Sequence, residues 1–381
     1  MNLEDLLAKI NAYQPEMLET LEILVKHESP STEKSALDSF AGRISERFSS
    51  LGGEVTLLAN TTNGDHAEVH FKAPQARSDR PGLILCHYDT VWPLGTIQER
   101  PFRIDDDKAY GPGVYDMKAS LVMFEYALRA MADFGAQLPR PIVLLVNSDE
   151  EIGSWTSREL IERHAGQAEY VLVLEPPTFE GALKTARKGV GNFLLKVKGV
   201  AAHAGSQPER GVSAITEIAH QILEVQDLVD EDKGTTINVG IVSGGSRSNV
   251  IAAQAIAEID GRAWTPQEAE RIDRAIKNLK PVIPGAELQI EGGFERPPMM
   301  RSEAILDLFH KAQKIGMGLG LELEEGSTGG GSDGNFTAAL GVPTLDGLGA
   351  MGDGAHADYE HILISHLPQR TALLAALLLE L

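Results

Sequence analysis

Three short runs of consecutive apolar residues constrain the fold of this chain most strongly. They read GLILC before His87, IVLLV before Asn147 and YVLVL before Glu175. Segments with the apolar spacing of helices, at about 118–134 and 156–164, lie between them. Strands that are apolar on both sides occur in parallel sheets, because the crossover helices bury both faces. The sequence therefore predicts an α/β fold with a mostly parallel sheet covered by helices on both faces.

The segment before these runs is expected to begin with an amphipathic helix over residues 3–27, followed by the turn ESPSTE. Ser31 or Thr32 is expected to cap the next helix, because a hydroxyl oxygen there can accept from the free N–H groups of the first turn. The strand-like runs GEVTLLA and HAEVHF follow.

The middle of the chain has a different pattern. From about residue 188, apolar and polar residues alternate in NFLLKVKG and AIAEIDGRA, and amphipathic helices are expected at 211–226 and 266–279. After Arg296 the earlier pattern of helix, strand and helix returns. We infer a smaller α+β domain inserted into the α/β domain. The predicted domains are residues 1–186 with 297–381, and residues 187–296.

Charge and composition exclude several partners. Lys and Arg number 34 against 55 Asp and Glu, a net charge of −21 that repels nucleic acid. No basic and apolar leader or uncharged apolar run of ~18 residues is present, so neither export nor membrane insertion is expected. Cys86 is the only cysteine, which fits the reducing cytoplasm. Any metal must therefore be held by His, Asp and Glu.

Polar residues at the ends of the predicted elements are candidate metal ligands, because ligands of open α/β sheets bind beyond the carboxyl ends of the strands. Each has an ordinary structural explanation when taken alone, as a strand-end histidine, a helix cap or a solvated turn residue. Together, two imidazoles and three carboxylates can hold two dications, with one carboxylate bridging them. The five candidates are His87, Asp116, Glu151, Glu175 and His356.

The run NSDEEIGSW contains three consecutive acids, Asp149, Glu150 and Glu151, which repel one another and are costly to bury without compensation. A metal can neutralise one of them while its neighbour, Glu150, acts as a general base on an activated water. Asp89 is expected to accept the other ring N–H of His87 and so fix its tautomer. Asp149 is interpreted as a turn or cap residue.

The chain resembles the dinuclear zinc peptidase and deacylase family that includes glutamate carboxypeptidase, acetylornithine deacetylase, succinyl-diaminopimelate desuccinylase and aminoacylase. The likeness is greatest to glutamate carboxypeptidase and extends over nearly the whole chain. It rests on motifs that occur in the family's order: CHYDTVWP, RIDDDKAYGPGVYDMKAS, NSDEEIGS, LEPPT, GVAAHAG, RSNVIAA, DGRAW, STGGGSD and GDGAHADYEH.

This resemblance implies a hydrolase with two Zn²⁺ ions, which Co²⁺ or Mn²⁺ could replace, and a cis peptide after Asp116. The substrate would be a small peptide or an N-acyl amino acid with an amide next to a free carboxylate. Glu150 would be the general base. The implied ligands are His87 and Glu175 for one ion, Glu151 and His356 for the other, and Asp116 as the bridge.

The resemblance also implies that the insert is a lid and dimerisation domain of a homodimer. His203 in AAHAG matches a histidine that reaches the partner's active site and helps to hold the substrate carbonyl oxygen. Asn249 and Arg262 match positions that contact the substrate, and the backbone at Gly330 could line a carboxylate pocket. No role is assigned to Lys184, Arg187, Lys188, Arg247 or Arg296.

Three functions remain open at this point. The first is an amide hydrolase of the carboxypeptidase type, and the second is an N-acyl-amino-acid deacylase or dipeptidase on the same site. The third is a metal-dependent binding protein without turnover, against which the presence of Glu150 and of all five ligands argues. The metal centre acts only on the scissile carbonyl, so it does not discriminate among substrates.

Overall fold

The computed structural model describes residues 2–381, which divide into two compact units. The first unit comprises the residues up to Ala186, Arg301–Thr328 and Ser332–Leu381. The second comprises Arg187–Met300 and Gly329–Gly331.

The boundaries of the second unit follow from contacts of Arg187. Its backbone pairs with that of Met299, so the segments at the start and the end of residues 187–300 are joined. Its guanidinium donates to the carbonyl oxygens of Gly330 and Gly331 at 3.2 and 3.0 Å. Residues 297–300 and 329–331, which the sequence pattern assigned to the first domain, therefore belong to the second unit.

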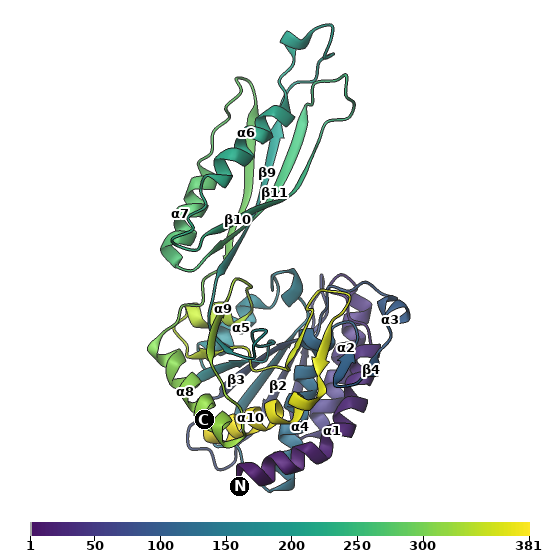
Figure 1. Cartoon of the computed structure of the whole chain (residues 1–381), viewed down its shortest axis with the longest axis vertical. Coiled ribbons are helices and arrows are strands. Elements are labelled where there is room, and N and C mark those ends of the chain that lie inside the picture. Colours follow the sequence, from purple (N-terminus) through teal and green to yellow (C-terminus); the bar gives the residue numbers. More distant parts are fainter. Residues whose placement is uncertain (1) are drawn as a thin grey trace. The chain divides into compact units, whose positions relative to one another are not determined.

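A six-stranded sheet forms the centre of the first unit, in the order β1-β2-β6-β3-β7-β14 (Figure 1). The last four strands run parallel to one another, whereas β1 and β2 are antiparallel at one edge. The predicted α/β class with a mostly parallel sheet is confirmed. The strands are β1 (Glu54–Leu58), β2 (His66–Phe71), β3 (Gly82–His87), β6 (Ile142–Asn147), β7 (Tyr170–Val173) and β14 (Thr344–Leu345).

Helices cover both faces of this sheet. In β3, Ile84 and Cys86 pack into one core with the longer helices, whereas Leu83 and Leu85 pack into a second core against the other face. Each such buried aliphatic side chain contributes about 2 kcal/mol, which explains why β3, β6 and β7 contain no charged residue before their ends. One face carries α1 (Leu3–Lys26), α2 (Lys34–Ser50), α4 (Ala119–Asp133), α8 (Glu303–Gly318) and α10 (Leu367–Glu380). The other carries α5 (Arg158–Ala165) and α9 (Gly334–Ala339).

The predicted cap of α2 is wrong. The N-cap residue is Glu33, and no side chain makes a capping hydrogen bond there. Ser31 instead donates its hydroxyl to the carboxylate of Asp89 at 2.8 Å. A tertiary contact with a buried carboxylate has taken precedence over a local cap.

The second unit is a four-stranded antiparallel sheet in the order β10-β11-β9-β12, with two helices packed on one face (Figure 1). Thr265 caps α7 as a hydroxyl acceptor for the backbone N–H of Glu268. The elements are β9 (Gly189–Lys198), α6 (Ala214–Gln226), β10 (Thr236–Gly244), β11 (Gln254–Ala263), α7 (Pro266–Lys277) and β12 (Glu287–Arg296).

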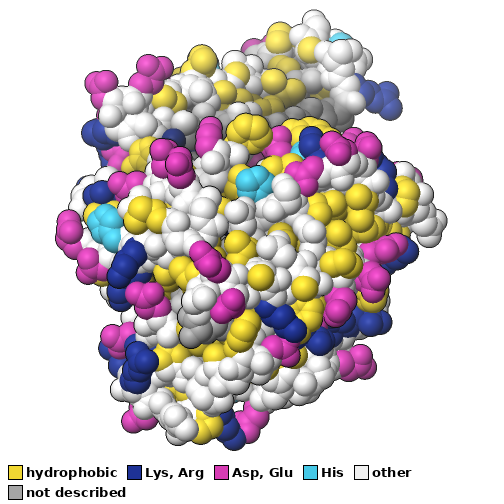
Figure 2. Space-filling model, turned by 60° about the horizontal axis from the view of Figure 1, so that its bottom comes forward, with side chains coloured by type: hydrophobic (Ala, Val, Ile, Leu, Met, Phe, Trp, Pro, Cys, Tyr) yellow, Lys and Arg dark blue, Asp and Glu magenta, His cyan; other side chains and the backbone are white. Residues whose placement is uncertain are grey.

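The surface is charged and mixed in sign. On the face shown in Figure 2, acidic side chains are interspersed with Lys and Arg, and hydrophobic side chains form small groups between them. Within residues 2–381, no helix has the length and hydropathy needed to cross a bilayer.

Glu268 is expected to stabilise the second unit in a pH-dependent way. Its buried carboxylate accepts hydrogen bonds from Arg271 (3.0 Å) and Thr235 (2.6 Å), and the Arg271 hydrogen bond lowers the pKa of Glu268 to about 2. We expect Glu268→Gln to reduce the free energy of unfolding by about 1–2 kcal/mol at pH 7. Because the folded pKa lies below the ordinary value of 4.5, this contribution is present above pH 4.5 and is lost as the pH falls towards 2.

Urea unfolding at pH 7 and pH 3 measures this effect. The difference between wild type and Glu268→Gln should shrink at pH 3, and an equal difference at both pH values would contradict the assignment. Glu270→Gln is the control, because Glu270 pairs with Arg274 on the exposed side of the same helix and should change stability little.

Candidate metal centre

The five predicted ligands lie on segments that leave the carboxyl edge of the central sheet or pack against it. His87 is the last residue of β3, and Glu175 follows β7 by two residues. Glu151 lies in a short turn, η2 (Glu150–Ile152), after β6. Asp116 lies in η1 (Val114–Lys118), before α4, and its peptide bond to Met117 is cis, as predicted. His356 lies in the loop between β15 (Gly352–Asp353) and β16 (His361–Leu363).

The carboxylate of Asp116 lies between two imidazoles. Its Oδ1 is 3.1 Å from Nε2 of His87, and its Oδ2 is 3.5 Å from Nε2 of His356. Glu175 lies beside the first imidazole, with 3.5 Å between Oε1 and Nε2 of His87. Glu151 lies beside the second, with 2.9 Å between Oε2 and Nε2 of His356. The five side chains therefore converge, and they form two halves that share Asp116.

This donor set fits divalent cations. Donor atoms of His87, Asp116 and Glu151 lie within 4.8 Å of one another, as do those of His87, Glu150 and Glu175. Oε1 of Glu151 is buried and has no hydrogen-bond partner within residues 2–381. A buried carboxylate oxygen without a donor is costly unless a cation lies against it. Nitrogen and oxygen donors of this kind suit zinc and similar metals.

These groups shift one another's pKa values strongly. Burial, followed by the charge of Asp116, raises the pKa of Glu151 to about 7. Hydrogen bonds to Asp116 and Glu151 raise the pKa of His356 to about 11. Burial would raise the pKa of Asp116, but hydrogen bonds from His356 and His87 hold it far below its usual range. The imidazoles therefore retain protons among these carboxylates, and binding of a dication would displace those protons.

Asp89 is fully buried between His87 and the acidic turn. Nδ1 of His87 is 3.1 Å from the backbone oxygen of Asp89 and 3.4 Å from its carboxylate. The same carboxylate accepts the backbone N–H groups of Glu150 and Glu151, each at 3.2 Å. Asp89 thus orients one imidazole and also holds the backbone of the turn that carries two candidate acids.

Asp149, the first of the three consecutive acids, points away from the candidate ligands. Its buried carboxylate accepts from the backbone N–H and hydroxyl of Thr156, both at 2.7 Å, and from the hydroxyl of Ser157 at 2.6 Å. These residues precede α5, so Asp149 closes the turn that leads into this helix, in agreement with its interpretation as a turn residue. Hydrogen-bond donors, not a metal, compensate its charge.

Glu360 is a structurally important residue that the sequence did not reveal. Its buried carboxylate accepts the backbone N–H groups of Gly113, Tyr115 and Asp116 at 2.8–3.1 Å and the indole N–H of Trp92 at 2.9 Å. Burial raises its pKa in spite of these donors. Glu360 therefore fixes the backbone on which Asp116 is placed, across more than 240 residues of sequence.

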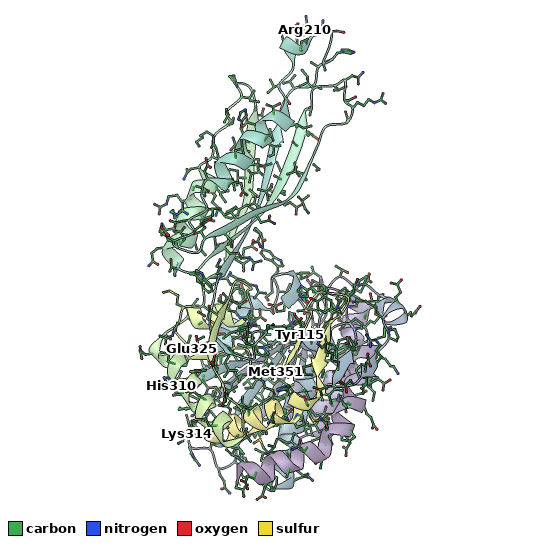
Figure 3. The ribbon with its side chains drawn as sticks, viewed as in Figure 1. Tyr115, Arg210, His310, Lys314, Glu325 and Met351 are labelled. Atoms are coloured by element: carbon green, nitrogen blue, oxygen red, sulfur yellow. The ribbon has the colours of Figure 1, made fainter. Side chains whose placement is uncertain are left out.

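Figure 3 shows where this anchored segment lies. Tyr115, which precedes Asp116, is inside the first unit together with Met351, which precedes the loop of His356. A Cβ built on Gly352 would come within 2.8 Å of the Tyr115 ring, so the two segments pack closely and only glycine fits there. Glu360 is the last residue before β16. The segments that carry Asp116 and His356 are thus held together on both sides of the candidate ligands.

The predicted substrate residues lie in the second unit, in two separate places. The backbone N–H of Ala204 donates to the carbonyl of Asn249, so His203 and Asn249 are neighbours. Arg210, seven residues after His203, lies at one end of this unit (Figure 3). Arg262 lies near the carboxyl end of β11, whereas Asn249 precedes its amino end. At ~3.3 Å per residue, the eight steps from Gln254 to Arg262 along β11 separate these positions by about 26 Å.

Arg262 lies beside the glycine-rich segment but already has a carboxylate partner. Its guanidinium makes hydrogen bonds of 2.7 and 2.8 Å to Asp260 and one of 3.1 Å to the carbonyl of Gly329. The pairing with Asp260 competes with the predicted binding of a substrate carboxylate. The carbonyl of Gly330 accepts from Arg187, so this cation supports the glycine segment.

The chain matches the family model for peptidase family M20/M25/M40 over residues 83–380. It belongs to this family. Members are metal-dependent, and the chain is accordingly a metallohydrolase, as the motifs in its sequence indicated. The predicted relationship to the peptidase and deacylase family is confirmed.

Individual relatives include enzymes with different names. Carboxypeptidase G2 from a Pseudomonas species is 32% identical over 381 residues, covering 97% of this chain and 90% of that protein. A succinyl-diaminopimelate desuccinylase from Delftia acidovorans is 28% identical over 312 residues, covering 76% of this chain and 79% of that protein. The solved structure of aminopeptidase PepT from Bacillus cereus has the same fold, with a TM-score of 0.77, 22% identity and 96% and 98% coverage. The structure of an M20 family metallo-carboxypeptidase from Sulfolobus solfataricus has a TM-score of 0.76 and 18% identity. The match covers 95% of this chain and 98% of that chain.

Glu360→Gln should weaken metal binding. The carboxylate now accepts hydrogen bonds from four N–H groups. The NH₂ of a glutamine amide would face some of these donors and could not accept from them, so the segment that carries Asp116 would loosen. We expect metal affinity to fall by about tenfold, the usual scale for a residue that orients a ligand. Isothermal titration of metal-free protein with Zn²⁺ measures this.

The matched control is Glu217→Gln in the second unit. Glu217 is also buried, and its carboxylate accepts the backbone N–H groups of Val282 and Ile283. The Glu217→Gln substitution should reduce the free energy of unfolding without changing the affinity for metal. Equal affinities for the wild type and Glu360→Gln would refute the role of Glu360.

Proposed function

We propose that this protein is a zinc-dependent hydrolase that cleaves an amide bond next to a free carboxylate, in the manner of a carboxypeptidase. The observation that carries the proposal is the Asp116 carboxylate, whose two oxygens face two different imidazoles. This is the arrangement expected of a bridging ligand between two metal ions. Carboxypeptidase G2 is a relative over almost the whole chain, which favours this substrate type.

The proposed ligands divide into two sets. His87 and Glu175 would hold one Zn²⁺, and Glu151 and His356 the other, with Asp116 shared. Two bound dications would supply Lewis acidity to the scissile carbonyl and to the attacking water. Asp89 holds His87 through Nδ1, which leaves Nε2 directed at Asp116 and Glu175.

Glu150 is the proposed general base. It lies on the same turn as Glu151, and a carboxylate oxygen lies within 4.8 Å of donor atoms of His87 and Glu175. Its backbone N–H is held by Asp89. Glu150 takes a proton from the water that attacks the amide carbon and delivers it to the leaving nitrogen as the C–N bond breaks. The products are a carboxylic acid and a free amine.

His203 is proposed to donate a hydrogen bond to the substrate carbonyl oxygen. The backbone N–H groups of Gly205 and Ser206 both donate to its Nδ1 at 3.1 Å, so the neutral ring carries its proton on Nε2. A strand of ten residues separates His203 from Arg262, so both can serve one substrate only if they come from different copies of the chain. We therefore propose a homodimer, which sedimentation velocity at micromolar concentration tests directly; a monomer would exclude it.

A second candidate is removal of an acyl group from an N-acyl amino acid on the same site. The desuccinylase relative favours it, since its name indicates removal of an acyl group. Assays with paired substrates distinguish the two reactions. Release of a C-terminal amino acid from dipeptides or aroyl amino acids supports the first, and preferential cleavage of short N-acyl amino acids supports the second.

Glu150→Gln should abolish turnover without loss of metal. The amide cannot accept the proton of water, whereas the five proposed ligands are unchanged, so kcat should fall by at least about 10³-fold with unaltered metal content. Stopped assays combined with metal analysis measure both quantities. Glu159→Gln, an exposed glutamate on α5, is the control and should behave like the wild type. Near-normal turnover of Glu150→Gln would assign the base to another residue.

Removal of metal should abolish hydrolysis reversibly. Dialysis against a chelator should eliminate activity, and two equivalents of Zn²⁺ per chain should restore it. His356→Ala deletes a ligand of one set only and should reduce the stoichiometry of tightly bound zinc from two to one. Elemental analysis after gel filtration gives the count. Full activity of the metal-free protein, or one zinc per wild-type chain, would contradict the two-ion centre.

A further inference from the structure

One buried carboxylate joins both ends of the turn that carries Glu150. Oδ2 of Asp333 accepts from the side-chain amide of Asn147 at 2.5 Å, and Oδ1 accepts from the hydroxyl of Ser154 at 2.5 Å. Asn147 ends β6, and Ser154 follows η2. The six residues between these two contacts include Glu150 and Glu151. Asp333 is 186 and 179 residues away in sequence, so this contact is a product of the fold.

The hydroxyl contact holds an unusual backbone conformation. Ser154 has φ of 57°, in the left-handed region that non-glycine residues seldom adopt and that costs about 1 kcal/mol. Its N–H donates to the backbone oxygen of Asp149 at 2.7 Å, and its hydroxyl is fixed by Asp333. The turn therefore closes sharply after Glu151 instead of continuing into α5.

Asp333 is itself rigidly placed. It is 3% exposed and immediately precedes α9, whose Phe336 packs in the core between α5 and the sheet. The N–H of Gly334 is held by the hydroxyl of Ser332, which also donates to buried Asp346. A carboxylate that is fixed in this way can hold the residues that donate hydrogen bonds to it in defined positions.

We propose that Asp333 is the positioning residue of the general base: it clamps Asn147 and Ser154 and so sets where the Glu150 carboxylate lies relative to His87 and Glu175. The inference rests on the proposed function of Glu150. Asp89 holds the backbone N–H groups of Glu150 and Glu151 from the other side of the turn. Asp89 and Asp333 together fix the turn at its middle and at its two ends.

The clamp should affect turnover more than binding. Glu150 acts on the water and on the leaving nitrogen, and a displacement of about 1 Å can cost on the order of 10²-fold in rate. The proposed metal ligands outside this turn, His87, Asp116, Glu175 and His356, lie on other segments and contact one another. Loss of the clamp should therefore lower kcat by about 10–100-fold, with KM within about twofold. Four of the five proposed ligands lie outside the turn, so the metal should be retained at saturating Zn²⁺.

The test compares Asp333→Ala with Asp346→Ala. Both substitutions delete a buried carboxylate of the same region. Asp333 accepts from Asn147 and Ser154, whereas Asp346 accepts from Ser332. Asp333→Ala should lose kcat, whereas Asp346→Ala should keep it within about threefold. Asp333→Asn should restore most of the rate, because its amide oxygen still accepts from Ser154. Its NH₂ can donate to Oδ1 of Asn147 once the Asn147 amide turns over, and this oxygen has no hydrogen-bond partner within residues 2–381.

Several outcomes would overturn the proposal. Unchanged kcat in Asp333→Ala excludes the clamp, and an equal loss in Asp346→Ala indicates general loosening of the core. Loss of metal together with kcat would assign Asp333 to ligand placement instead. If Asp333→Ala does not fold, Ser154→Ala removes one of the two contacts and should still lower kcat by several-fold with constant KM.

Hydrogen exchange separates failure of the clamp from failure of the proposed function. Amides of residues 148–155 should exchange faster in Asp333→Ala than in Asp346→Ala, whether or not any amide substrate is hydrolysed. Absence of hydrolysis by the wild type would refute the proposed function and leave this comparison valid. Equal exchange in the two variants would refute the clamp.

Discussion

The first unit depends on how it compensates several buried carboxylates gathered at one edge of its sheet. A carboxylate removed from water is stable only when hydrogen-bond donors or cations replace its solvation. Asp89, Asp149, Asp333 and Glu360 receive backbone N–H groups, hydroxyls or side-chain N–H donors. Asp116, Glu151 and Glu175 instead face imidazoles, and one oxygen of Glu151 has no donor within residues 2–381. This difference separates the acids that build the site from those suited to bind metal.

Parallel strands explain why these groups meet. β3, β6 and β7 are adjacent and point the same way, so their last residues and the turns that follow them lie along one edge. In the register of the sheet, His87 is directly opposite Asn147. Asn147 in turn contacts Asp333, so the strand that ends in a proposed ligand is tied to the clamp of the proposed base. Displacement of one strand would therefore disturb both.

The sequence predicted the parts of this site that obey local rules. Apolar runs that end in polar residues identified His87, Glu151 and Glu175, and the contacts of Asp149 agree with its prediction as a turn residue. Glu360 and Asp333 were not singled out, because their partners lie 179–268 residues away and a glutamate or aspartate in a loop has no local signature. The prediction of Ser31 as a helix cap failed for the same reason, because its hydrogen-bond partner, Asp89, is distant in sequence. Patterns reveal strand ends, whereas tertiary hydrogen bonds become visible only in the folded chain.

The second unit imposes a different constraint, because its sheet is rigid along the strand direction. His203 and Asn249 lie before the amino end of β11, and Arg262 lies near its carboxyl end. A paired strand cannot shorten, since each residue is fixed in register with β9 and β10. Rotation of the whole unit would move both groups but would not bring them together. One copy of the chain therefore cannot place His203 and Arg262 on the same small substrate, and the proposed homodimer rests on this distance.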